Sequence, residues 1–132
     1  MQIIGRDIRK VMGASTLTSD EVRNQSGEDL GKIEEIMLDV PSGRIAYAVL
    51  SFGGFLGIGD KLFAVPWQAL QLNEDDKCFI LNVSKDRLKD APGFYKNNWP
   101  DMSDPEFGGR VYDYYGIERP VATPEKPFKK AM

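Results

Sequence analysis

The sequence contains no histidine and only one cysteine, Cys78, among its 132 residues. Histidine is the commonest general base and the commonest metal ligand, so its absence removes the usual candidate for both roles. A single cysteine cannot form an internal disulfide or a zinc cluster, and Cys78 is most simply interpreted as a buried, inert thiol in a strand. We therefore expect a protein that is not an enzyme, with no catalytic, metal-binding or cofactor-binding residue and no cofactor.

Long apolar runs are absent as well. The longest uncharged stretch, residues 45–59, includes four glycines, whereas a membrane-spanning helix needs ~20 mostly apolar residues. Residues 1–7 contain no apolar stretch of signal-peptide length. These observations predict a cytoplasmic protein that does not span a membrane, and contact with a membrane surface remains an open alternative.

Positive charge is not in excess, because 17 basic residues stand against 20 acidic ones and the net charge is −3. Proteins that bind duplex nucleic acid usually show the opposite balance, so we do not expect a nucleic-acid partner. Gly57-Ile58-Gly59 lacks a third glycine and a following helix, and it does not predict a phosphate-binding loop. The length and the 42% apolar content favour one folded domain.

Alternating apolar residues predict a series of strands and no long helix between them. The expected strands are Glu21–Asn24, Asp29–Val40, Arg44–Phe52, Lys61–Val65 and Cys78–Val83, and Gln71-Leu72 is expected to form a short extended segment. Both faces of Arg44–Phe52 are apolar, which is typical of a strand that is covered on both sides. The pattern predicts a mainly β protein, a small antiparallel β-barrel over residues 17–92.

One residue of the second expected strand breaks the alternation. Ile33 is out of step with Ile36, Leu38 and Val40. A β-bulge at Glu34-Glu35 would restore the pattern, since one extra residue exchanges the two faces. A strand that begins later would explain the pattern equally well, and the sequence leaves both interpretations open.

The remaining segments differ in composition from the barrel. Residues 1–16 are expected to form a loose arm, and residues 117–132 a disordered tail. Residues 93–116 hold seven of the 14 aromatic residues and predict an aromatic-rich extension with one short helix. Asp104-Pro105 is a typical helix start and Gly116 a typical stop. Because aromatic side chains are enriched at interface cores, the extension predicts a homodimer.

Two groups of apolar side chains are candidates for contact with a partner. The first group is expected at the tip of the glycine-rich loop, where it would touch a protein or a membrane surface. The second lies in the extension, where the residues either pack on the barrel or form an interface. The candidate interaction residues are Phe55, Leu56, Ile58, Trp99, Phe107, Tyr114 and Tyr115.

An ordered set of short motifs resembles the PRC-barrel family, which is named after the cytoplasmic domain of the photosynthetic reaction-centre H subunit. Residues 91–94 and 99–102 are similar to a bacterial stand-alone subgroup of that family. The matching motifs are Gly27–Ile33 with Ile36 and Asp39, Gly43–Val49, Phe52–Gly54, Gly59–Lys61, and Val65–Trp67 with Leu70.

The resemblance implies a strongly bent antiparallel β-barrel that acts as a non-catalytic protein-interaction or assembly module. It also implies two alternatives. One is a peripheral membrane-associated module related to the H subunit, and the other is an RNA-linked or ribosome-maturation module. We expect neither the N-terminal transmembrane helix of the H subunit nor the additional N-terminal domain of the ribosome-maturation relative in this protein.

Overall fold

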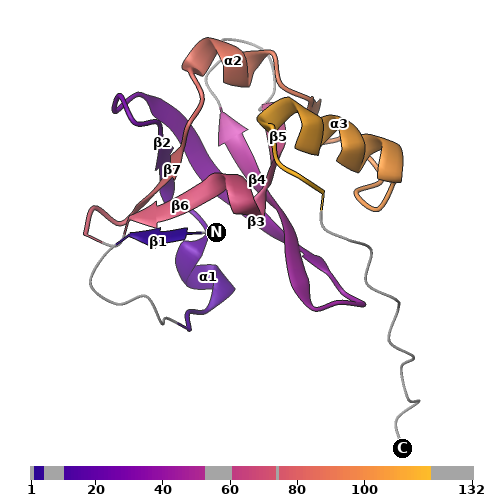
Figure 1. Cartoon of the computed structure of the whole chain (residues 1–132), viewed down its shortest axis with the longest axis horizontal. Helices are drawn as coiled ribbons and strands as arrows, with labels where there is room; N and C mark the ends of the chain where they lie inside the picture. Colours follow the sequence, from indigo (N-terminus) through magenta and orange to yellow (C-terminus); the bar gives the residue numbers. More distant parts are fainter. Residues whose placement is uncertain (1, 5–10, 53–60, 74, 120–132) are drawn as a thin grey trace, which may run out of the picture.

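The computed structural model describes residues 2–4, 11–52, 61–73 and 75–119, and Figure 1 shows their arrangement. Short helical segments connect or cover the strands; they are α1 (Ala14–Leu17), η1 (Trp67–Ala69), α2 (Lys85–Lys89) and α3 (Pro105–Tyr115). The strands within the described residues are β1 (Gln2–Ile4), β2 (Glu21–Arg23), β3 (Asp29–Asp39), β4 (Arg44–Phe52), β5 (Lys61–Pro66), β6 (Leu70–Asn73), β7 (Cys78–Leu81) and β8 (Gly93–Tyr95).

The described strands form one sheet in the order β1-β6-β7-β2-β3-β4-β5-β8. This confirms the mainly β prediction. Within the described part of the chain, the end strands β1 and β8 do not pair with each other, so hydrogen bonds do not close the sheet into a barrel. The antiparallel prediction is wrong for two pairs, because β1–β6 and β2–β7 are parallel. In each pair, strands far apart in the sequence come together, and no local pattern signals their direction.

The β-bulge in β3 is confirmed. Ile33 lies opposite Leu50 and Glu35 lies opposite Val49, so Glu34 is the extra residue. The register between β3 and β4 shifts a second time between Met37, which lies opposite Tyr47, and Leu38, which lies opposite Ile45. Bulges increase local twist and bend a strand, and Figure 1 shows the turn end of the β3–β4 hairpin projecting away from the rest of the sheet.

Strand β4 is covered on both faces, as its apolar pattern predicts. On one face, Leu50 and Phe52 belong to the main core, which also holds Phe63 and Phe79. On the other face, a second cluster lies beneath α3 and contains Tyr47, Val49, Leu62, Ala64, Phe94, Phe107, Val111 and Tyr112. The sheet therefore separates two apolar layers, and the C-terminal part of the protein completes the second.

The helix predicted after Asp104 is confirmed as α3. The Asp104 carboxylate accepts a hydrogen bond from the Glu106 backbone N–H at 3.0 Å, and Gly116 ends the helix with φ +66°. A Cβ at Gly108 would lie 2.8 Å from the Tyr47 hydroxyl oxygen. This glycine, which weakens the isolated helix, therefore allows α3 to approach β4 closely.

Two strands were not predicted from the sequence. Gln2–Ile4, within the expected loose arm, forms β1 beside β6. Gly93–Tyr95, within the expected extension, forms β8 beside β5, and its Phe94 side chain is buried in the second cluster. Each strand has only three residues, too few for an alternating pattern to be recognised.

Candidate functional site

The predicted interaction residues that the structure describes, Trp99, Phe107, Tyr114 and Tyr115, do not form one surface. Phe55, Leu56 and Ile58 lie outside the described residues. In the extension, Phe107 is only 5% exposed and packs edge-on against the Tyr47 ring at 6.1 Å between centroids. This corrects the expectation for Phe107, because its side chain belongs to the protein's own core and offers no surface to a partner.

Trp99 retains an exposed face. Its ring lies 5.0 Å from that of Phe94, and its side chain remains 39% exposed. Tyr95, on β8, is 46% exposed. One side of the Trp99 ring therefore packs on Phe94, and the other side meets solvent, where an interface stays a prediction.

Tyr114 and Tyr115 occupy the last turn of α3, with their rings 5.4 Å apart. Tyr114 contacts α2, where the Arg87 guanidinium lies 4.5 Å from the centre of its ring. Tyr115 points its hydroxyl into the protein, and this oxygen is buried without a hydrogen-bond partner in the described part of the chain. Burial raises the pKa of the Tyr115 phenol far above its ordinary value.

The turn end of the β3–β4 hairpin presents an apolar surface that the sequence analysis missed. Leu38 is 60% exposed and Val40 is 70% exposed. Beyond the second bulge the hairpin has left the sheet, so these side chains meet solvent. An alternating pattern reports a strand but does not report what covers each face.

The outer backbone edge of β3 is left unpaired by the described strands along the same segment. Strand β2 pairs with β3 only between Asp29 and Lys32, and Ile33 is held by backbone hydrogen bonds to residues 19 and 20. Among the described strands, none pairs with this edge from Glu34 to Asp39. We call Leu38, Val40 and this free edge the hairpin surface.

The charges on the free edge of β3 from Glu34 to Asp39 are acidic, and Arg44 lies opposite Asp39 on β4. Glu34 forms an ion pair with Lys96 at 3.6 Å. The Asp39 carboxylate accepts a hydrogen bond from the Ser42 hydroxyl within the turn. Glu35 is exposed, and its carboxylate accepts a hydrogen bond from the Ile36 backbone N–H. The edge therefore carries negative charge beside exposed apolar side chains.

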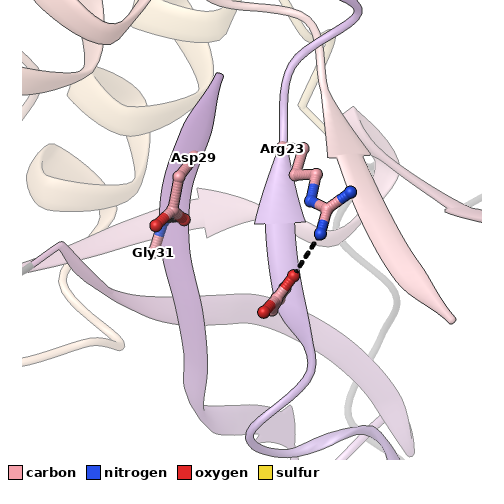
Figure 2. Close-up of polar contacts among 4 residues, drawn as sticks. Arg23, Asp29 and Gly31 are labelled. Carbon is pink, nitrogen blue, oxygen red and sulfur yellow. Dashed lines mark hydrogen bonds and ion pairs between the residues drawn. The ribbon is translucent and has the colours of Figure 1, made fainter. Parts of the chain in front are cut away.

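The charged residues at the start of the sheet act locally. Figure 2 shows Arg23 on β2 near Asp29 and Gly31 on β3. Arg23 forms an exposed ion pair with Glu21 at 2.6 Å, and the Asp29 carboxylate accepts a hydrogen bond from the Gly31 N–H at 2.9 Å. Nearby Cys78 is 2% exposed, and burial raises the pKa of its thiol. These contacts are local to β2 and β3, and the raised thiol pKa is the opposite of what activates a cysteine nucleophile.

Across the residues that the structure describes, no group of three or more cysteine, aspartate and glutamate side chains is placed to hold a metal ion. The helices in this part of the chain are all too short or too polar to cross a membrane.

The architecture is that of a small β domain with a bent, mostly antiparallel sheet and a helical C-terminal part. Residues 9–88 match the family model of the PRC-barrel domain. The chain belongs to the PRC-barrel domain family, as its sequence motifs suggest. Comparison with curated proteins finds no match.

Proposed function

We propose that this protein is a non-catalytic protein-interaction module of the PRC-barrel type and that it binds its partner through the hairpin surface. The proposal rests on the exposure of Leu38 (60%) and Val40 (70%) on a hairpin that projects from the sheet. Leucine and valine are normally buried. Their exposure beside an unpaired strand edge is the arrangement that strand addition uses.

The free edge of β3 supplies backbone hydrogen-bonding groups to an incoming extended segment. Such segments gain affinity from main-chain hydrogen bonds and specificity from alternate side chains. A strand edge that stays unpaired can also pair with other chains and cause aggregation. The acidic side chains Glu35 and Asp39 oppose pairing between two copies of this edge and favour a segment that carries lysine or arginine.

The test compares capture by the full-length protein and by a variant with Leu38→Ser and Val40→Ser. A partner captured from the native cell should be retained by the unmodified protein and by a Tyr95→Ser control, and lost by the hairpin variant. Circular dichroism should show the same strand content in all three proteins. Equal capture by the hairpin variant would refute the assignment of this surface.

Self-association is a second proposal, supported by Tyr95 and Trp99. Both rings are exposed at the β8 edge of the sheet, and aromatic residues are enriched in interface cores. A homodimer through this edge predicts about twice the 14.8 kDa chain mass in light scattering. The mass should fall toward that of the monomer when both residues are changed to serine. A full-length protein that is already monomeric at high concentration contradicts the dimer.

The membrane-associated and RNA-linked alternatives lead to different measurements. Association with anionic liposomes that survives the hairpin substitutions would favour a membrane module. Salt-sensitive RNA binding by the isolated protein would favour the RNA-linked module. The proposed interaction module predicts neither result.

A further inference from the structure

A cavity of about 330 Å³ opens between the end of α3 and the opposite part of the sheet. Its volume is within the range of roughly 300–1,000 Å³ typical of small-molecule sites. Segments distant in the sequence meet here: the β2–β3 turn, η1, β6, the end of β7 and the end of α3. The described lining residues are Gln25, Gln68, Ala69, Gln71, Ile80, Leu81, Asn82, Val83, Tyr115 and Ile117.

The lining has an unusual chemical composition. Four of these side chains are carboxamides, and Tyr115 is the only ionisable residue among the described ones. Each carboxamide places a donor and an acceptor side by side. The remaining lining residues are apolar: Ala69, Ile80, Leu81, Val83 and Ile117. The described wall thus offers many neutral hydrogen-bonding groups and no charge to pair with an ionic ligand.

Tyr115 supplies an independent observation. Its hydroxyl oxygen is buried and has no hydrogen-bond partner within the described residues. A buried hydroxyl without a partner is costly, and native structures usually satisfy it with protein, water or ligand. Because the phenol stays protonated at neutral pH, its hydroxyl is a buried hydrogen-bond donor without an acceptor among the described residues, on a side chain that lines the cavity.

We propose that this cavity binds a small, uncharged, planar ring that carries adjacent hydrogen-bond donors and acceptors, as a nucleobase does. Asparagine and glutamine side chains make paired hydrogen bonds with such an edge. The cavity is separate from the hairpin surface, so this proposal does not depend on the proposed function.

The test is a titration of the isotope-labelled full chain with adenine, uracil, glucose and adenosine monophosphate, followed by NMR. Adenine or uracil should shift the side-chain amide resonances of Gln68 and Asn82 at millimolar concentration. Glucose should not, and the phosphate should add no affinity. The proposal fails if neither base produces these shifts, if glucose binds as well as the bases, or if the monophosphate binds tenfold more tightly than adenine.

Two variants test the proposed contacts. Tyr115→Phe removes only the unpartnered hydroxyl, so base binding should weaken by about 2- to 10-fold, the effect of one hydrogen bond. The melting temperature should stay equal or rise.

Gln68→Met is the second variant. It keeps the side-chain length at an exposed position and should weaken base binding by a similar factor, so the proposal can still be tested if Tyr115→Phe misfolds. Tyr95→Phe, on β8, is the control and should leave binding unchanged. Unchanged binding in both cavity variants would overturn the proposal.

Discussion

Arg87 and Tyr114 join α2 to α3 through a reciprocal pair of hydrogen bonds. The Arg87 guanidinium donates to the Tyr114 carbonyl oxygen at 2.6 Å, and the Tyr114 hydroxyl donates to the Arg87 carbonyl oxygen, also at 2.6 Å. The guanidinium also lies over the tyrosine ring. This contact fixes the last turn of α3 against the segment that follows β7, and Tyr115 in the same turn lines the cavity.

We expect Tyr114→Phe to lower the free energy of unfolding by about 1 kcal/mol, because it removes one of these hydrogen bonds and keeps the ring. Urea denaturation measures the change. Tyr95→Phe removes an exposed tyrosine hydroxyl elsewhere and should change stability by less than about 0.5 kcal/mol. Equal effects of the two substitutions would show that the contact contributes nothing specific.

Gly31 should tolerate no side chain. Its φ is +106°, and a Cβ at this position would overlap the Ser51 carbonyl oxygen of the neighbouring strand. Backbone strain and this overlap together predict that Gly31→Ala costs about 3 kcal/mol or more. Thermal denaturation of the purified variant measures the loss.

Gly43 is the matched control for this substitution. It also has a positive φ, +74°, but a Cβ there would meet nothing within 4 Å. Gly43→Ala should therefore cost only about 1 kcal/mol, the penalty for the left-handed conformation. If both variants lose the same stability, the overlap with Ser51 is not what requires glycine at residue 31.

The central strands were predictable because their side chains alternate locally. The bulge at Glu34 was one of two interpretations of a misplaced Ile33, and the pairing with β4 decides between them. The parallel pairing of β2 with β7 was not predictable, since it joins residues 21–23 to residues 78–80 and depends on the whole chain path. Edge strand β8 has only three residues and carries no recognisable period.

The candidate sites were harder to predict than the strands. Phe107 has the sequence features of an interface residue, yet α3 directs it onto Tyr47. Leu38 has those of a core residue, yet the hairpin carries it into solvent. Tyr115 and the four carboxamides come from separate segments, so only the folded chain brings them to one cavity. Burial in each case depends on tertiary packing, which a local pattern does not contain.

Stability should decrease at alkaline pH. Burial raises the pKa values of Tyr47, Cys78, Tyr112 and Tyr115 in the folded protein. Above the unfolded-state values, about 8.5 for cysteine and about 10 for tyrosine, the unfolded chain releases protons that the folded chain retains. The free energy of unfolding should therefore be constant between about pH 7 and 8 and fall as pH rises further.

Urea denaturation at pH 7, 9, 10 and 11 measures this decrease. Each fully protected group contributes up to about 1.4 kcal/mol per pH unit. Tyr115→Phe should reduce the slope between pH 10 and 11, because it removes one buried phenol. A stability that is the same at pH 9 and pH 11 would contradict the burial of these groups.

Gly108 allows a test of how closely α3 approaches the sheet. Alanine in place of glycine stabilises a helix by about 1 kcal/mol, but here the added Cβ would lie 2.8 Å from the Tyr47 hydroxyl oxygen. No other described atom outside the immediate helix lies within 4 Å of that Cβ. The hydroxyl alone therefore opposes the substitution.

We expect Gly108→Ala to lower stability in the native protein and to raise it by up to about 1 kcal/mol in a Tyr47→Phe background. Urea denaturation of the four proteins in this double-mutant cycle measures the coupling, which should be about 1–3 kcal/mol. The same effect of Gly108→Ala in both backgrounds would mean that α3 lies farther from β4 than the structure places it.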